Sequence, residues 1–271
     1  MCKERLFVYA VAVLLTAILA VGCEPENSTI PSPSGPDNPG GTVEPDTLVA
    51  AVFSVSDSQR VRFSPGNLQY IAGEWRFAEH QGDVLSVYND DTCDLFRWSA
   101  ENTNWGLTDE ETAGANTWMY YREPFVDYGT NQQLIESLGE GWRTLTAEEW
   151  DYLLNKRTFD GDTGLYNSYM NVRINGQYGL LIFPDGYTQQ LEHPGVIPDS
   201  CVFLPAGGYR MDDRMYVTKS KGHYRTASPH PTTPWECVTV SFYQDNGFPR
   251  ARLGYSNRTI GVAVRLVRDV E

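Results

Sequence analysis

The fold is decided by the stretch Gly141-Trp142-Arg143-Thr144-Leu145-Thr146-Ala147-Glu148-Glu149-Trp150-Asp151-Tyr152-Leu153. It contains a capping box, because the Thr146 hydroxyl can accept the amide of the third helical residue while the Glu149 carboxylate reaches back to the amide of Thr146. The apolar residues after this box share one face of a helix. The stretch therefore predicts a helix that begins after Thr146 and runs to about Asn155.

A second helix is expected immediately upstream, at Asn131–Leu138. Its apolar residues have helical spacing, and Gly139 follows as a terminator. The large rings of Trp142, Trp150 and Tyr152 are assigned to the core. These two helices are the strongest local features of the chain.

Short strand-like runs separated by turn residues make up the rest of the chain from Leu48. The expected strands are Val49–Val55, Arg60–Phe63, Leu68–Ile71, Glu74–Phe77, Met170–Ile174, Tyr178–Phe183, Val202–Leu204, Arg214–Val217, Val238–Tyr243 and Thr259–Val267. Within the last of these, Arg265 is expected to serve structure by hydrogen-bonding loop carbonyls. Residues 79–130 form a long irregular region, and no repeat or Pro-rich break divides residues 48–271. We therefore expect one α+β domain, with helices segregated from a larger share of strand.

The first 23 residues predict a lipoprotein signal. A basic start at Lys3 and Arg5 is followed by the apolar run Leu6–Val21, which is shorter than the ~20 residues that span a bilayer comfortably. Small residues then precede Cys23, and this segment resembles the lipobox of bacterial lipoproteins. We expect residues 1–22 to be removed and Cys23 to be acylated. The alternative is an ordinary secretory signal with an incidental cysteine.

Residues 23–47 are expected to form a lipidated, flexible stalk. The segment is dense in Pro, Ser, Gly, Asn and acidic residues, and it cannot bury enough apolar surface to offset chain entropy. Its acidic start, at Glu24 and Glu26, resembles the surface-export signals of lipoproteins in Gram-negative gut anaerobes. We expect a lipid anchor in the outer membrane with display at the cell surface, and the periplasmic face is the alternative.

The composition excludes some classes of partner. The 271 residues carry a formal net charge of −14, which disfavours binding to nucleic acid or to anionic lipid through broad electrostatics. We therefore expect no nucleic-acid partner, and contact with the membrane through the lipid anchor alone. Aromatic residues make up 13% of the chain, a share typical of β-rich domains packed by large rings.

The cysteines leave two alternatives open. Beyond Cys23, the mature chain holds Cys93, Cys201 and Cys237, an odd number for an oxidising compartment. Either Cys201 and Cys237 form a disulfide, or all three are buried free thiols. No Cys/His spacing predicts a zinc site, and no complete calcium loop is present, so we expect no metal and no cofactor.

No catalytic residue is assigned from the sequence. The four histidines lie in loop-like sequence, and no Gly-x-Ser-x-Gly elbow accompanies them. Acidic pairs are plentiful, but in so acidic a chain they are typical of solvated faces. Because catalytic triads are assembled in space and not in sequence, a hydrolase without a recognisable motif is kept as an alternative.

Several blocks carry a resemblance to a known family. They are the stretch 141–153, Phe53-Ser54-Val55, Phe63-Ser64-Pro65-Gly66-Asn67-Leu68-Gln69-Tyr70, Val202-Phe203-Leu204-Pro205-Ala206-Gly207-Gly208-Tyr209-Arg210 and Gly261-Val262-Ala263-Val264-Arg265-Leu266-Val267-Arg268. Over roughly residues 50–269 the chain resembles paralogous lipoproteins of Gram-negative gut anaerobes, which are similar in turn to formylglycine-generating sulfatase-modifying enzymes and to C-type-lectin-like variable proteins. The resemblance implies a C-type-lectin-like fold of mixed small sheets with two flanking helices, in which the last strand returns beside the first.

The departures from these families bear on function. Sulfatase-modifying enzymes use two cysteines close together near the C-terminus, whereas Cys201 and Cys237 are far apart here. The calcium-binding motifs of sugar-binding C-type lectins are missing, since Glu123-Pro124-Phe125 lacks the amide and Gln244-Asp245-Asn246 lacks the proline. In the paralogous lipoproteins a tryptophan usually occupies the position of Arg225. The resemblance therefore supports neither the sulfatase-modifying chemistry nor calcium-dependent sugar binding.

The region 223–258 is the predicted ligand-binding surface, since it corresponds to the binding surface of the lectin-like variable proteins. Its candidate contact residues are Tyr224, Arg225, Trp235, Tyr243, Asp245, Asn246, Phe248, Arg250, Arg252 and Tyr255. Tyr, Trp and Arg concentrate binding energy at interfaces. The alternative is that about half of these side chains pack the core.

Together these features predict an envelope-anchored, non-catalytic module that binds or adheres to a protein or glycan. The first alternative is a structural or accessory subunit of a cell-surface assembly such as a fimbria. The second alternative is the hydrolase considered above.

Overall fold

The structure, a computed structural model, describes residues 49–85, 91–101, 103–107, 122–157, 168–187, 195–211, 214–216, 218–243 and 251–271. All of them belong to one contact unit, Glu44–Glu271. The predicted signal peptide, the acylated Cys23 and the stalk lie outside the described residues. Among the helices of the described residues, none is long and apolar enough to cross a bilayer.

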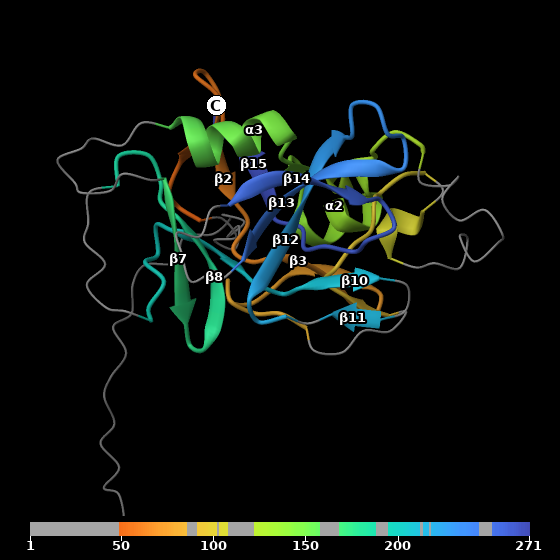
Figure 1. The fold of residues 1–271 in the computed structure, drawn as a ribbon, viewed down its shortest axis with the longest axis horizontal. Coiled ribbons are helices and arrows are strands. Elements are labelled where there is room, and N and C mark those ends of the chain that lie inside the picture. Colours follow the sequence, from red (N-terminus) through yellow and green to blue (C-terminus); the bar gives the residue numbers. More distant parts are fainter. Residues whose placement is uncertain are drawn as a thin grey trace, which may run out of the picture. The chain divides into compact units, whose positions relative to one another are not determined.

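Short strands make up most of the regular structure, with two short α-helices beside them (Figure 1). The helices are α2 (Gln132–Leu138) and α3 (Ala147–Asp151), and α3 continues as the wide turn η3 (Tyr152–Lys156). Single 3-10 turns occur at η1 (Asn104–Gly106) and η2 (Tyr128–Thr130). The expected α+β class is therefore confirmed, in a form rich in small antiparallel sheets.

Fifteen strands are found among the described residues. They are β1 (Phe53–Ser54), β2 (Arg60–Phe63), β3 (Leu68–Ile71), β4 (Glu74–Phe77), β5 (Thr92–Cys93), β6 (Arg143–Thr144), β7 (Tyr169–Ile174), β8 (Gln177–Ile182), β9 (Val202–Pro205), β10 (Tyr209–Met211), β11 (Arg214–Tyr216), β12 (Lys221–Pro229), β13 (Glu236–Tyr243), β14 (Arg252–Asn257) and β15 (Leu266–Asp269). Strands β2, β3 and β4 have the predicted bounds. Strands β5, β6, β10, β12 and β14 were not predicted, and β5 lies in the region 79–130 that was expected to be irregular.

The predicted terminal strand Thr259–Val267 is wrong in its bounds. Residues before Leu266 make isolated bridges to separate segments, including Phe96 to Val262 and Arg210 to Gly261. A continuous ladder begins only at β15, where Val267 pairs with Phe63 of β2. The apolar residues of this segment are therefore buried against several different neighbours, and the segment does not form one continuous strand.

Both helix starts are capped by side chains, and the cap of α3 is the one that was predicted. The side chain of Asn131 accepts a hydrogen bond from the Leu134 amide at 3.1 Å and caps α2, which ends before Gly139 at a φ of 81°. In α3, the amide of Glu149 donates to the Thr146 hydroxyl at 3.2 Å, and the amide of Thr146 donates to the Glu149 carboxylate at 2.7 Å. The predicted capping box is confirmed.

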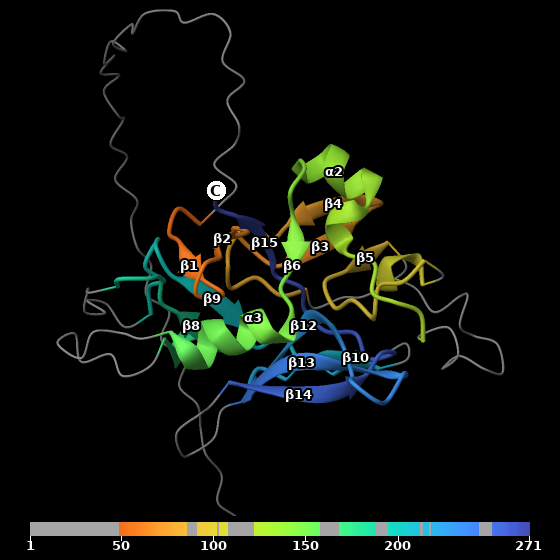
Figure 2. The same ribbon diagram turned by 90° about the horizontal axis from the view of Figure 1, so that it is seen from above.

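Strand β15 is an inner strand of a four-stranded sheet, whose order is β1-β2-β15-β6. Four smaller antiparallel units have the orders β4-β3-β5, β7-β8-β9, β10-β11 and β12-β13-β14. Helix α3 packs on the sheet β12-β13-β14, and α2 packs against β4 (Figure 2). The C-terminal strand therefore sits beside the N-terminal hairpin, between two layers that each carry one helix.

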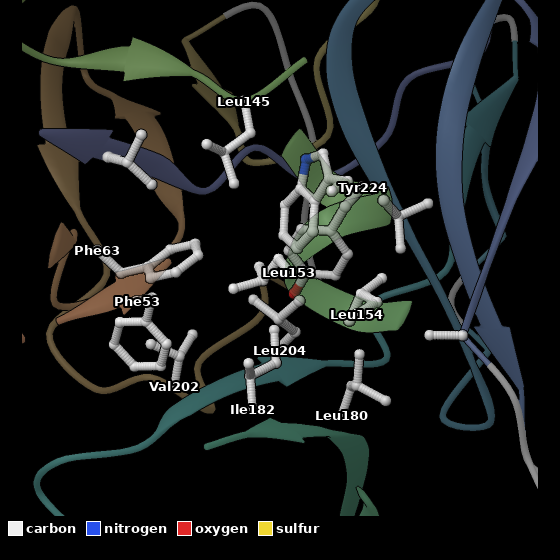
Figure 3. Packing of buried hydrophobic residues seen from close by; sticks show 14 of the residues in the cluster. Phe53, Phe63, Leu145, Leu153, Leu154, Leu180, Ile182, Val202, Leu204 and Tyr224 are labelled. Atoms are coloured by element: carbon white, nitrogen blue, oxygen red, sulfur yellow. The ribbon is translucent and has the colours of Figure 1, made fainter. Parts of the chain in front are cut away.

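Helix α3 and its continuation supply the centre of the main core (Figure 3). Trp150 and Leu153 pack there with Phe63 from β2, Leu204 from β9 and Val240 from β13. A second cluster surrounds Trp142.

The assignment of Trp142 and Trp150 to the core is confirmed, since each is at most 3% exposed. The assignment of Tyr152 to the core is wrong. Its side chain is only half-buried and its hydroxyl donates to Asp57 at 2.9 Å, because η3 turns this position away from the apolar face.

Five arginines are almost fully buried, namely Arg97, Arg210, Arg225, Arg258 and Arg265. Arg265 donates to the Phe203 carbonyl at 2.7 Å and to the side chain of Gln81 at 3.0 Å. Its predicted structural role is confirmed. Burial lowers the pKa of Arg265 to about 10, so the side chain is still cationic at neutral pH.

The three cysteines of the described residues are free and buried. The alternative of three buried thiols is therefore confirmed, and the Cys201–Cys237 disulfide is not formed. Burial raises the pKa of the Cys201 thiol to about 11, which keeps it protonated at neutral pH.

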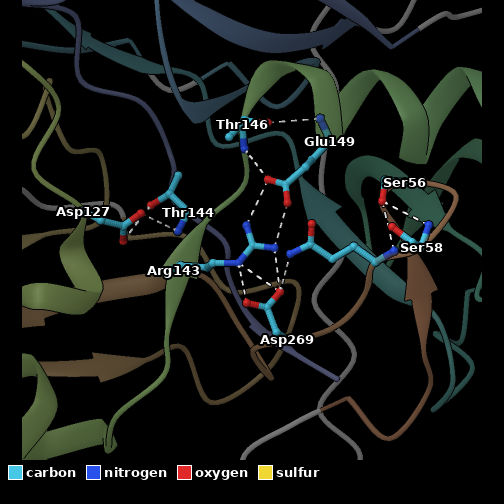
Figure 4. Close-up of polar contacts among 9 residues, drawn as sticks. Ser56, Ser58, Asp127, Arg143, Thr144, Thr146, Glu149 and Asp269 are labelled. Carbon is cyan, nitrogen blue, oxygen red and sulfur yellow. Dashed lines mark hydrogen bonds and ion pairs between the residues drawn. The ribbon is translucent and has the colours of Figure 1, made fainter. Parts of the chain in front are cut away.

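Arg143 joins the capping box to the C-terminal strand (Figure 4). Its guanidinium binds the Glu149 carboxylate through two hydrogen bonds at 2.7 and 2.9 Å, and it also binds Asp269 at 2.7 Å. Gln59 donates to the same Asp269 carboxylate at 2.9 Å. We call Arg143, Glu149 and Asp269 the arginine clamp. Hydrogen bonding to the two carboxylates raises the pKa of Arg143.

Replacing Arg143 by alanine should lower the free energy of unfolding by about 2 kcal/mol, since hydrogen bonds to charged partners contribute ~1.5–3 kcal/mol. Chemical denaturation of the mature protein measures this loss. The matched control is Lys156→Ala, which breaks the exposed Lys156–Asp151 pair and should leave the unfolding midpoint unchanged. Equal effects of the two substitutions would contradict a structural role for the clamp.

Candidate functional site

The sheet β12-β13-β14 packs one face on the main core. Its other face is buried at Arg225 and Thr239 and is partly open at the end that carries Ser241 and Tyr243. Val240 and Phe242 of the central strand β13 belong to the main core beside α3. Ser241 and Tyr243 alternate with them and are half-buried on the other face. This alternation is the one predicted from the sequence of Val238–Tyr243.

A continuous strip of polar and aromatic side chains crosses this outer face. Tyr209 and Tyr216, on the hairpin β10-β11, stack with ring centroids 5.0 Å apart. His223 of β12 meets the Tyr209 ring edge-on at 5.7 Å, and its Nδ1 lies 3.1 Å from the Ser241 hydroxyl. The next pair in register is Ser241 with Arg252.

The strip ends where the Arg252 guanidinium covers the ring of Tyr243, 5.0 Å from its centroid. We call these six residues the tyrosine strip: Tyr209, Tyr216, His223, Ser241, Tyr243 and Arg252. Two segments far apart in sequence thus contribute to one surface, because β10-β11 lies against the start of β12 through the bridge between Gly208 and Gly222 (Figure 1).

The strip is able to make several kinds of contact at neutral pH. Burial and the nearby charge of Lys221 lower the pKa of His223, so its ring is neutral and holds one donor and one acceptor. Arg252 is exposed and cationic, and the tyrosines offer flat, half-exposed rings with hydroxyls. Such a surface can stack on a flat or apolar ligand face and hydrogen-bond at its rim.

The His223–Ser241 contact also has a bearing on catalysis. A serine nucleophile needs an imidazole base at this distance, and the base needs a carboxylate on its second nitrogen. Within the described part of the chain, no carboxylate hydrogen-bonds the Nε2 atom of His223. Ser241 and His223 are thus placed as the nucleophile and base of such a triad would be, and no described carboxylate completes it.

Two of the predicted contact residues are wrong. Tyr224 and Arg225 are each only 1% exposed. Tyr224 lies on the core face beside Val240, whereas Arg225 lies on the same face as His223, where the carbonyls of Phe96 and Ile260 cover it. The Tyr224 hydroxyl donates to the Pro205 carbonyl at 3.0 Å and accepts from Asn67 at 3.1 Å. Its burial raises the pKa of Tyr224.

Arg225 has three acceptors in the interior. Its guanidinium donates to the Cys237 Sγ at 2.7 Å, to the Phe96 carbonyl at 3.0 Å and to the Ile260 carbonyl at 2.7 Å. A guanidinium surrounded in this way joins β12, β13 and the C-terminal run. It is not available to a ligand.

The other described candidates are exposed, but the structure does not bring all of them together. Tyr243 and Arg252 lie in the tyrosine strip. Trp235 is 41% exposed and immediately precedes β13, so it stands roughly 25 Å from Tyr243 along an extended chain. Tyr255 is 60% exposed and pairs with Val238, which places its side chain on the opposite face of the sheet.

Four predicted residues, Asp245, Asn246, Phe248 and Arg250, lie in the segment 244–250, outside the described residues. The sequence reasoning missed Tyr209, Tyr216, His223 and Ser241 as site residues. The alternation of Val238–Tyr243 places Ser241 on the same face as Tyr243, so Ser241 could have been predicted from the sequence. The other three depend on the pairing of β12 and β10, which no local pattern indicates.

The structure offers no candidate metal centre in the ranges that it describes, since no three His, Cys, Asp or Glu side chains are grouped closely enough there. The tyrosine strip itself contains no carboxylate and no thiol. Its chemistry is that of stacking and hydrogen bonding.

Replacing Arg225 by lysine should lower the free energy of unfolding by about 2 kcal/mol, since a single ammonium cannot serve three acceptors and leaves buried groups unpaired. Thermal denaturation is the measurement. Arg252→Lys is the matched control on the exposed face and should leave the melting temperature unchanged. If Arg225→Lys were as stable as the control, the interior role assigned to Arg225 would be refuted.

The tyrosine strip brings Tyr209 and Tyr216 together with His223, Ser241, Tyr243 and Arg252 of the predicted region. Comparisons with models of protein families, with curated proteins and with solved structures found no match for this chain. A function for it is therefore argued from the strip, the sequence signals and the fold.

Proposed function

We propose that this chain is an envelope-anchored lipoprotein whose β-rich domain binds a protein or glycan ligand and catalyses no reaction. The observation that carries this proposal is the tyrosine strip, in which stacked rings, a neutral imidazole, a hydroxyl and one cation share a continuous surface. Side chains of these types dominate the binding energy of known interfaces.

The strip is suited to recognition because it is held in place before a ligand arrives. Each of its side chains stands on a strand, and the sheet behind β13 is packed on the core. Contacts within the strip further restrict the rotamers of Tyr209, His223 and Tyr243. Ordering costs on binding are therefore small, which favours affinity.

The anchor comes from the sequence. Acylation of Cys23 would hold the mature chain on a membrane, since each buried methylene contributes ~0.8 kcal/mol. The stalk of residues 23–47 would set the domain of residues 48–271 at a distance from the bilayer. We propose the outer membrane, with display at the cell surface.

For the domain we propose a C-type-lectin-like fold of the paralogous-lipoprotein type. In support, β15 returns beside the N-terminal hairpin β1-β2, and helices α2 and α3 flank small sheets. The pairing partner of β15 is β2 and not β1, so the return is beside the second strand of that hairpin.

A second candidate function is that of a structural subunit in a cell-surface assembly. The observation that favours it is the outer edge of β14, with which no strand of the described residues pairs. The Arg258 amide donates to the Trp235 carbonyl, so the backbone groups of Leu253 and Tyr255 point to that outer edge. A strand from another subunit could add there.

Binding of the mature lipoprotein, in detergent, to glycan and protein arrays tests the leading proposal. We expect specific binding that weakens about tenfold or more in a Tyr209→Ala/Tyr243→Ala variant, because the strip loses two of its three tyrosine rings. The matched control is Tyr255→Ala, which removes a more exposed tyrosine from the opposite face. The control should bind as the wild type does.

Other outcomes would contradict this assignment. Unchanged binding by the double variant would remove the strip as the ligand site. Loss of binding in Tyr255→Ala alone would instead place recognition at the β14 edge and favour the assembly subunit.

The anchor is tested by Cys23→Ala and protease treatment of intact cells. We expect the wild-type domain to be cleaved from whole cells and the variant to be found unattached, because acyl chains supply the membrane affinity. Cleavage only after rupture of the outer membrane would place the domain in the periplasm. Membrane attachment of the variant would contradict lipidation at Cys23.

A further inference from the structure

A second recess lies away from the tyrosine strip, between the outer face of the β3-β4 hairpin and the loop 79–85. It is a cavity of about 550 Å³, within the range of small-ligand pockets. We call it the hairpin cleft. Its lining includes Gln69, Arg76, Glu79, Asp83, Val84 and Leu85.

The loop wall of the hairpin cleft is fixed by hydrogen bonds to the core. The Gln81 Oε1 accepts from the Phe203 amide at 2.7 Å and from Arg265 at 3.0 Å, and its amide nitrogen donates to the Cys201 carbonyl at 3.0 Å. Further along, the Leu85 amide donates to the Asp94 carboxylate at 2.7 Å. The recess is therefore built into the fold.

Gln69 is the unusual residue in this lining. It lies on the central strand of the sheet β4-β3-β5 and is only 5% exposed. Its side chain shares a face with Ile71 and Arg76, opposite the face on which Leu68 and Trp75 pack into the second core cluster. No residue of the described ranges hydrogen-bonds its amide group.

The Gln69 amide group is not one of the fully buried polar atoms that lack a partner, so it is open to solvent in the cleft and available to a ligand there. The Gln69 side chain can be satisfied from one direction, which is the cleft that it lines. The amide offers two donors and one acceptor to whatever occupies this space. The Gln69 amide therefore favours a polar ligand in the cleft.

Opposite charges line the two walls of the cleft. Arg76 stands on the strand wall, and Glu79 and Asp83 stand on the loop wall. Within the described ranges, Arg76 makes no ion pair with either carboxylate. The Asp83 carboxylate accepts one hydrogen bond, from the His80 amide at 2.9 Å. A cation and an anion thus face the same space without neutralising each other.

We propose that the hairpin cleft binds a small zwitterion of the size of an α-amino acid. The ligand carboxylate is bound by the Arg76 guanidinium and the Gln69 amide nitrogen, and the ligand ammonium is bound by Glu79 and Asp83. An apolar ligand side chain contacts Ile71, Val84 and Leu85. This site shares no residue with the tyrosine strip and goes beyond the function proposed for it.

Calorimetric titration of the mature lipoprotein with each of the twenty free amino acids tests this proposal. We expect binding of an apolar member such as leucine. N-acetyl-leucine amide, which lacks both charges, should bind at least tenfold more weakly. Glucose, a neutral ligand of similar size, should show no measurable binding.

Matched variants locate the site. Arg76→Ala should weaken leucine binding at least tenfold, whereas Arg62→Ala removes another exposed arginine, on β2, and should leave leucine binding unchanged. Tyr209→Ala/Tyr243→Ala should also bind leucine normally, which separates this site from the tyrosine strip. The proposal is overturned if no amino acid binds, if the uncharged derivative or glucose binds as tightly as leucine, or if Arg76→Ala binds like Arg62→Ala.

Discussion

The insertion of β15 between β2 and β6 is the constraint on which the rest of the structure depends. Leu266 and Val267 of this strand are buried, while its two polar residues each hold one helix. Arg268 donates to the last carbonyl of α2, Leu138, and covers the ring of Trp142 at 4.3 Å. Asp269 binds the arginine clamp, which carries the first turn of α3. A single strand of four residues thus fixes the positions of both helices.

The residues just before β15 hydrogen-bond to the backbone of the strands that carry the tyrosine strip. The amide of Ala263 donates to the His223 carbonyl, and the amide of Arg225 donates to the Ala263 carbonyl. Gly261 exchanges two backbone hydrogen bonds with Arg210 on β10. The backbones under His223 and Tyr209 are therefore held from behind by the same C-terminal segment, and a ligand would meet a surface whose ordering entropy has already been lost in folding.

Features with a local cause were predictable, and features with a long-range cause were not. The caps of α2 and α3 and the turn at Ala72-Gly73 of the β3-β4 hairpin each depend on residues a few positions apart. Strand β12 contains a glycine, a proline and two charges, and it exists because β13 pairs with it. The sequence alone does not predict β12, so it does not show that Tyr224 faces the core while its neighbour His223 faces the other side of the sheet.

The central claim is that ligands meet the domain at the tyrosine strip. The most direct measurement is photo-crosslinking on intact cells, with a benzophenone amino acid in place of Tyr216 in the full-length protein and, separately, in place of Arg62 on β2. If ligands bind at the tyrosine strip, position 216 gives a discrete adduct and position 62 gives none. The same adducts from both positions, or an adduct from position 62 alone, would contradict this claim.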